Sequence, residues 1–153
     1  MDIFQPGNLL YFDPFIFPDG GIPKPKYFLV LAEVGHDVVL ASLPTSKDHV
    51  PSDIPLQSGC LEMPQRMINV FVMKGNEPIT EDGFFFRVNT FVYGANIKTY
   101  SPRVFIEQEA NKVTAITVKG KMKGDIYLRL IECLKNSDAV RTRYKKYFCP
   151  SGN

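Results

Sequence analysis

Five consecutive side chains that can move protons or donate hydrogen bonds follow a short apolar segment in the first third of the chain. The segment Val38 to Leu43 has the length and composition of a buried strand, and Pro44 ends it because proline has no N–H for a β-ladder. The next residues supply two hydroxyls, an ammonium, a carboxylate and an imidazole: Thr45, Ser46, Lys47, Asp48 and His49. A rigid strand that leads into such a loop can hold catalytic or binding side chains in a defined place. Local composition alone favours the other interpretation, an ordinary polar turn.

Length and composition are typical of one folded domain. The 153 residues are enough to bury a core without metal or disulfide staples, and 44% hydrophobic with 22% charged residues is the composition of a soluble globular protein. The cysteines lie far apart and in no CxxC or CxxxH arrangement, so Cys60, Cys133 and Cys149 are expected to be plain thiols. With no long apolar run and no basic-then-apolar start, a reducing cytoplasm is the expected location.

Positive charge is concentrated late in the chain. The net charge is +2, but residues 111–153 hold ten Lys or Arg against three Asp or Glu, which leaves residues 1–110 at −5. The segment Arg141 to Tyr147 interleaves cations with aromatic rings, a composition that suits the phosphates and bases of single-stranded RNA. Basic residues also suit the C-terminus of a helix, where they complement its dipole, and this second interpretation is the stronger one.

Most of the chain reads as short strands. Residues 9–12 and 27–31 are expected to be strands, with a long loop rich in proline and glycine between them. Gly35 suits a hairpin turn that would pair the second strand antiparallel with Val38 to Leu43. Further strands are expected at residues 69–73, 84–88, 90–93 and 104–106, whereas 115–118 fits either a strand or a helical turn.

The end of the chain favours helix. Asp125 is a plausible N-cap, and the apolar residues that follow fall on one helical stripe: Ile126, Tyr127, Leu130, Ile131 and Leu134. A second helical stretch is expected around residues 140–148. Many short strands followed by a terminal helix predict a mainly β protein, an α+β chain with a small barrel or curled sheet and the helix packed against it.

Three segments, in this order, resemble the PemK/MazF-like toxin family. PGNLLYFD at 6–13 resembles the opening strand of the family, with Asn8 in place of the usual Asp. KPKYFLVLA at 24–32 and VVLASLPTSKDHVPSDIPL at 38–56 resemble the strand after the first loop and the strand that ends in a Thr or Ser. The resemblance covers about the first 60 residues. It implies a single domain over 1–153, an SH3-like β-barrel over about 6–118 and a C-terminal helical segment over about 125–148.

The resemblance also implies a set of site residues. An Arg of the first loop and the Thr or Ser after the third strand promote attack of a ribose 2′-OH on the adjacent phosphate in that family, and they correspond here to Lys26, or Lys24, and Thr45. A lysine neutralises a phosphate as a point charge but lacks the planar fork of guanidinium, so it supports the transition state less well. His49 titrates near neutral pH and could act as acid or base. Further substrate contacts are expected from Lys24, Ser46 and Lys47.

The function implied is that of a metal-independent endoribonuclease toxin of a toxin-antitoxin pair, acting on single-stranded RNA without a cofactor. Its expected partners are an acidic antitoxin protein and a second copy of the chain in a homodimer, with no membrane. In such a dimer the apolar stripe of residues 126–134 serves either the core or the interface. Because the family arginine is replaced, a non-catalytic SH3-like module that binds nucleic acid or a protein stays open. A third possibility is an enzyme of unrelated fold that uses His49 and Asp48.

Overall fold

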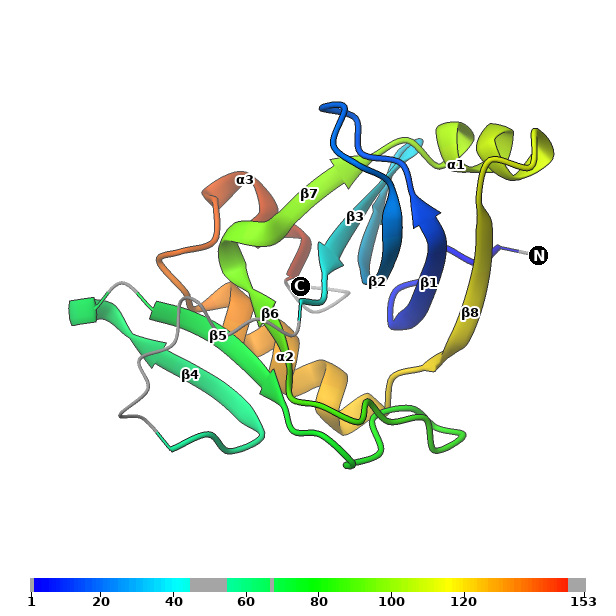
Figure 1. The fold of residues 1–153 in the computed structure, drawn as a ribbon. Coiled ribbons are helices and arrows are strands. Elements are labelled where there is room, and N and C mark those ends of the chain that lie inside the picture. Colours follow the sequence, from blue (N-terminus) through cyan, green and yellow to red (C-terminus); the bar gives the residue numbers. More distant parts are fainter. Residues whose placement is uncertain (1, 45–54, 67, 149–153) are drawn as a thin grey trace.

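The computed structural model describes residues 2–44, 55–66 and 68–148, which form two antiparallel sheets and a few short helices (Figure 1). The larger sheet has five strands in the order β7-β3-β2-β1-β8. Their bounds are β1 (Asn8–Phe15), β2 (Lys24–Val34), β3 (Asp37–Ser42), β7 (Ile97–Tyr100) and β8 (Ala115–Lys121). β8, the segment that fitted either a strand or a helical turn, is therefore a strand. It pairs antiparallel with β1.

The first three strands confirm the expected β start. β1 pairs antiparallel with β2, and β2 pairs antiparallel with β3 around a turn in which Gly35 has φ of 62°, a value that favours glycine. The expected long first loop is shorter than predicted. Pairing of β1 with β2 resumes at Phe15 and Lys24 after a register shift, so the loop spans only residues 16–23. The prolines of this segment are accommodated at an irregular hairpin end, where their missing N–H groups cost no ladder bond.

The smaller sheet consists of β4 (Gly59–Met63), β5 (Ile68–Met73) and β6 (Thr90–Tyr93) in the order β4-β5-β6. The strands expected at 69–73 and 90–93 are confirmed, whereas the strand expected at 84–88 is wrong. The aromatic residues there form a ring cluster instead, because Phe84 and Phe86 pack on each other and on Tyr27 of β2. The segment just after β3 links the two sheets, since the N–H of Phe91 in β6 donates to the carbonyl of Pro44 at 2.9 Å.

The strand expected at 104–106 is wrong, because these residues lie in helix α1 (Pro102–Ala110). Proline at the first helical position starts α1 in a favoured way. Of the three apolar residues only Phe105 is buried, at 4% exposure, while Val104 and Ile106 are 48% and 60% exposed. A three-residue apolar run fits a strand and a helix equally well, and only packing decides between them.

Helix α2 (Gly124–Lys135) and the short helix α3 (Thr142–Lys145) confirm the helical end of the chain. Asp125 lies in the first turn of α2 and not at the N-cap, a position that Lys123 occupies. Three 3-10 turns complete the described elements: η1 (Pro64–Arg66), η2 (Gly94–Asn96) and η3 (Lys146–Phe148). None of the described helices has the length and apolarity needed to cross a membrane.

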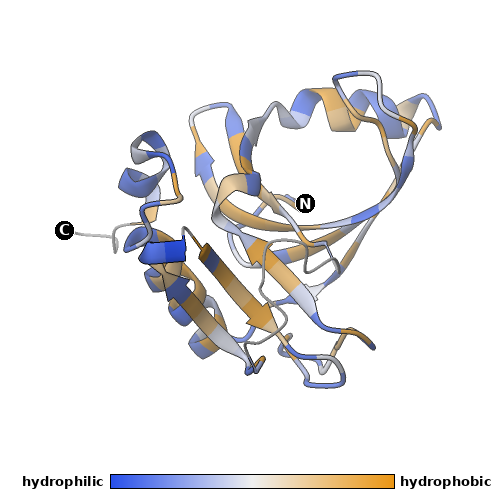
Figure 2. Ribbon diagram, turned by 60° about the vertical axis from the view of Figure 1, so that its left-hand side comes forward, coloured by the Kyte–Doolittle hydropathy of each residue, from blue (hydrophilic) through white to orange (hydrophobic). Residues whose placement is uncertain are grey.

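The core lies on both faces of the larger sheet. On one face Leu29 and Val39 pack with Phe71 of the smaller sheet and with Leu130 and Leu134 of α2. The apolar stripe of α2 therefore belongs to the core. On the other face Phe12, Phe28 and Leu40 form a second cluster with Phe105 of α1. Figure 2 shows the strands largely in the hydrophobic colours and much of the helices and turns in the hydrophilic ones, as expected for elements buried on one side.

The expectation of plain thiols is wrong for two of the three cysteines. Cys60 of β4 and Cys133 of α2 form a disulfide that closes a loop of sequence separation 73. The pair could not be inferred from spacing, because α2 approaches β4 only through the packing of the core. A disulfide also weakens the argument for a reducing compartment. Cys149 lies outside the described residues.

Candidate functional site

The candidate site is a hollow of about 420 Å³ on the face of the larger sheet that carries α1. It opens where β2 begins, where β3 ends and beside the edge strand β7. Its aromatic walls come from Phe15, Phe17, Phe28 and Tyr100. Phe28 and Phe15 are almost fully buried and in ring contact, with centroids 4.6 Å apart, so this wall is rigid. The hollow is therefore shaped by the core rather than by surface loops alone.

Lys26 is the central charge of this hollow. Its position on β2 opposite Phe12 directs the half-buried side chain to the aromatic face. Burial, followed by the nearby charges of Lys24 and Lys98, lowers the pKa of Lys26 below the ordinary lysine value. Loss of water around an ammonium and repulsion from like charges both disfavour the charged form. A bound anion would offset both effects, which makes the hollow suitable for a phosphate or carboxylate.

The ring of Phe17 lies close to the ammonium groups of both lysines of the first hairpin, Lys24 and Lys26. The Nζ of Lys26 lies 5.6 Å from the centroid of the Phe17 ring, and the Nζ of Lys24 lies 5.9 Å from it. Such cation–π contacts hold a flexible side chain near one place at small energetic gain. Lys24 itself is exposed and does not line the hollow. Lys24 is thus placed beside the site and Lys26 within it.

The end of the third strand also reaches the hollow. Ser42, the last residue of β3, lines it and is paired with Phe28. The N–H of Leu43 then donates to the carbonyl of Tyr27 at 3.1 Å, which holds the chain against β2 up to the start of the loop. The remaining expected site residues lie outside the described residues: Thr45, Ser46, Lys47 and His49.

Sequence reasoning missed the contribution of β7. Lys98, Thr99 and Tyr100 of this edge strand line the hollow, and Asn96 of η2 precedes them. A weak signal was present, because Ile97, Thr99 and Tyr100 are residues that favour strands. Asp19 at the hairpin tip is the one carboxylate among the described residues that line the hollow, and its Oδ1 accepts the N–H of Gly21 at 3.0 Å. It closes the turn of the loop.

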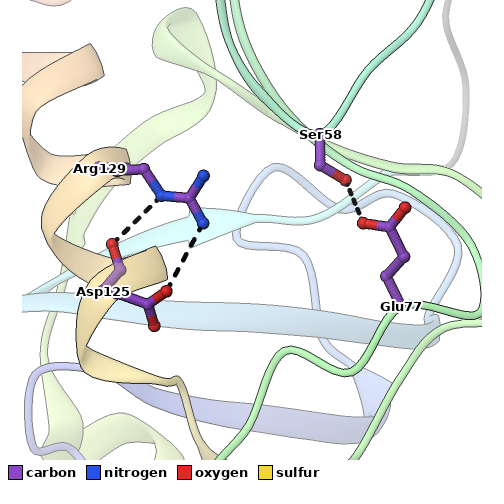
Figure 3. A network of polar contacts seen from close by, with 4 residues as sticks. All are labelled: Ser58, Glu77, Asp125 and Arg129. Atoms are coloured by element: carbon purple, nitrogen blue, oxygen red, sulfur yellow. Dashed lines mark hydrogen bonds and ion pairs between the residues drawn. The ribbon is translucent and has the colours of Figure 1, made fainter.

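A second polar group at the other end of the molecule has no arrangement for catalysis. Ser58 Oγ donates to Glu77 Oε1 at 2.6 Å and accepts the N–H of Lys74 at 3.2 Å, so it fastens β4 to the loop after β5 (Figure 3). Arg129 turns back to Asp125 within α2, at 3.9 Å between charged atoms. Both pairs are exposed and stabilise local structure only slightly. Within residues 2–44, 55–66 and 68–148, no three His, Cys, Asp or Glu side chains gather as a metal site would require.

The hollow thus combines a partly desolvated ammonium, a second lysine and aromatic walls at the end of a strand that leads into a loop of titratable residues. Such an arrangement can hold a phosphate ester with an adjoining ring system. Comparisons of the chain with protein families, with curated proteins and with solved structures found no match.

Proposed function

We propose that this protein is a metal-independent endoribonuclease toxin that acts on single-stranded RNA. The observation that carries the proposal is Lys26, a half-buried lysine in an aromatic hollow beside the end of β3. The resemblance of the first 60 residues to PemK/MazF-like toxins points to Lys26, or Lys24, and to the loop that follows β3. An SH3-like barrel within a single domain belongs to the same proposal, and two packed antiparallel sheets are compatible with it.

The substrate is held through phosphate and base. The ammoniums of Lys26 and Lys98 neutralise a phosphate, and the half-exposed ring of Phe17 or Tyr100 offers a surface for a base. Bases of single-stranded RNA are free to stack on such rings, whereas those of a duplex are not. The single carboxylate among the described lining residues, Asp19, leaves the hollow cationic. RNA is thus favoured over a cationic or apolar ligand.

The chemistry proposed is transfer of the phosphodiester within the RNA strand. The ribose 2′-oxygen forms a bond to phosphorus, the bond from phosphorus to the 5′-oxygen breaks, and a 2′,3′-cyclic phosphate and a 5′-hydroxyl result. One proton leaves the 2′-OH and one proton reaches the leaving 5′-oxygen, a task that suits the imidazole of His49. Lys26 stabilises the negative charge on the phosphate oxygens, and Thr45 orients the reacting groups by a hydrogen bond.

The partners follow from the same charge arrangement. An acidic segment of an antitoxin would compete with RNA for the cations of the hollow, so its binding would inhibit cleavage. A homodimer remains part of the proposal, although the buried stripe of α2 is not available for it. A toxin that cleaves cellular RNA acts in the cytoplasm. Conditions there are reducing and act against the Cys60–Cys133 disulfide.

A second candidate function is binding of single-stranded RNA without cleavage. The specific observation in its favour is that Lys26 stands where the family has arginine. A single ammonium cannot hold two phosphate oxygens in the fixed geometry that guanidinium gives, so ground-state binding can survive while transition-state support is lost.

The decisive experiment is incubation of the purified protein with mixed-sequence single-stranded RNA in EDTA, followed by analysis of the ends. Thr45→Ala and Lys26→Ala are compared with Arg129→Ala, which removes an exposed positive charge on α2 away from the hollow. Cyclic-phosphate ends in the wild type and the Arg129 variant only would support the toxin. Cleavage that persists at full rate in the Lys26 and Thr45 variants would contradict it. Intact RNA in all samples, with binding retained, would favour the second candidate.

A further inference from the structure

A second hollow of about 380 Å³ lies beside the same edge strand. It is bounded by Ile97, Lys98 and Thr99 of β7 and by the segment from Arg141 to Tyr147, which includes α3. Figure 1 shows β7 running between α3 on one side and the β1–β2 hairpin on the other. The volume falls within the range of about 300–1,000 Å³ that small-molecule sites occupy.

The lining of the second hollow is cationic. It includes Lys98, Arg141 and Arg143, all of them exposed, and no carboxylate occurs among its described lining residues. Salt bridges to these three cations are likewise absent from the described part of the chain. Cations gathered without a counter-charge repel one another, and a bound phosphate relieves that repulsion. The ligand that matches this hollow is therefore an anion.

Tyr144 makes one of the arginines a fixed group. The ring of Tyr144 is 4% exposed and packs into the core, so it is a rigid support. The guanidinium of Arg143 lies over it at 4.9 Å from the centroid and donates from Nη2 to the Tyr144 Oη at 3.2 Å. An arginine stacked in this way loses little further freedom when it binds a phosphate oxygen. Tyr147 adds a half-buried ring to the same hollow.

The two hollows are neighbours across the edge of β7. Lys98 and Thr99 line both of them. Ile97 lines only the hollow beside α3 and Tyr100 lines only the Lys26 hollow, while Lys98 and Thr99 between them lie at the boundary. Burial raises the pKa of Tyr100, and the nearby charge of Tyr144 raises it further, so these two rings, one from each hollow, lie close together. The two hollows therefore adjoin at Lys98 and Thr99.

We propose that the second hollow is a nucleotide subsite for the same RNA strand. It binds the phosphate of a residue flanking the scissile one through Arg141 and Arg143, and it receives the flanking base against the ring of Tyr147. The inference rests on the proposed RNA substrate. It assigns the basic and aromatic segment near the end of the chain to substrate binding.

The test measures binding of 2′-O-methyl oligonucleotides, which lack the attacking hydroxyl, so that cleavage is not needed. Fluorescently labelled mixed-sequence dinucleotide and hexanucleotide probes are titrated against wild type, the double variant Arg141→Ala/Arg143→Ala, and Arg129→Ala as the matched control. We expect the double variant to bind the hexanucleotide about tenfold more weakly and with a salt dependence reduced by about one to two counterions, since each lost phosphate contact removes roughly one. The ratio of hexanucleotide to dinucleotide affinity should fall as well.

Tyr147→Ala and Tyr147→Phe separate stacking from charge. Loss of the ring should weaken hexanucleotide binding about fivefold or more, whereas phenylalanine should preserve it. Equal hexanucleotide affinity in the double variant and in Arg129→Ala would overturn the subsite, even if Thr45-dependent cleavage is found. Binding of an acidic peptide, but not of the hexanucleotide, through Arg141 and Arg143 would also overturn it. A hexanucleotide effect without any RNA cleavage would instead retain the subsite and refute the nuclease.

Discussion

Lys26 of β2 and Lys98 of β7 line the same hollow although strand β3 separates their strands in the sheet. The Nζ of Lys26 lies 5.6 Å from the centroid of the Phe17 ring, and the charge of Lys98 contributes to the lowered pKa of Lys26. Two cations held near each other in a partly desolvated hollow repel each other, and a bound anion offsets this repulsion. An acidic ligand is therefore expected to bind most favourably beside these two lysines.

Lys26→Arg should raise the rate of RNA cleavage. Guanidinium can hold two phosphate oxygens at once, which stabilises the transition state better than a point charge does, so an increase of about three- to tenfold in kcat is expected. The measurement is single-turnover cleavage of a labelled RNA. Lys24→Arg is the matched control, because Lys24 lies beside the hollow and is exposed. A faster Lys24→Arg with an unchanged Lys26→Arg would reverse the roles of the two lysines.

RNA affinity should fall with rising pH earlier than an ordinary lysine would allow. Burial and the charges of Lys24 and Lys98 lower the pKa of Lys26, so this side chain loses its proton, and with it the attraction to phosphate, below the usual lysine range. Anisotropy titrations with a 2′-O-methyl probe at constant ionic strength, from neutral pH upward, would show the decline. In Lys26→Arg the affinity should stay constant over the same range, because guanidinium keeps its proton. Identical curves for both proteins would rule out Lys26 as the phosphate ligand.

Tyr127→Phe should lower the free energy of unfolding by about 1 kcal/mol at neutral pH, the usual net contribution of one hydrogen bond. The phenol of Tyr127 on α2 donates to the carbonyl of Leu31 on β2 at 2.9 Å, and the variant leaves that carbonyl without this donor. Urea unfolding would measure the change. RNA binding should not change, because Tyr127 lines neither hollow.

The same tyrosine should also shape the stability of the protein in alkali. Burial raises the pKa of Tyr127 to about 12 from the ordinary 10.0. The unfolded chain therefore releases this proton first, the folded chain binds more protons between pH 10 and 12, and stability falls as pH rises through that window. Tyr127→Phe should lose stability less steeply there than wild type. A slope equal to that of wild type would show that Tyr127 does not titrate differently in the two states.

Reduction of the Cys60–Cys133 disulfide should lower the free energy of unfolding by about 2–4 kcal/mol, as expected for a cross-link that closes a long loop of the unfolded chain. Wild type and Cys60→Ser are unfolded in urea with and without dithiothreitol. Reductant should destabilise the wild type and leave Cys60→Ser unaffected, while Cys149→Ser should respond as wild type does. If reductant has no effect on the wild type, the two thiols are not joined in the purified protein.

Local patterns were enough to predict β1, β2, β3 and α2. The three strands are rich in apolar residues and a glycine turn joins β2 to β3, while the apolar residues of α2 fall on one stripe. The same reasoning failed at 104–106, because three apolar residues satisfy both periods. It also missed β4 and β7, short strands with few buried side chains that exist because their neighbours supply hydrogen-bonding partners.

The features of the candidate site also fall into two groups, those predicted from the sequence and those seen only in the tertiary structure. The sequence by itself determined that Lys26 directly precedes the apolar run of one strand and that a loop of proton-carrying residues follows another, since both facts depend on neighbouring residues along the chain. Only the tertiary structure decided that Lys98 joins Lys26, that Arg143 stacks on a buried Tyr144 beside β7, and that Cys60 meets Cys133. These contacts join segments far apart in sequence. They arise from the order of strands and the packing of the core, which no local pattern encodes.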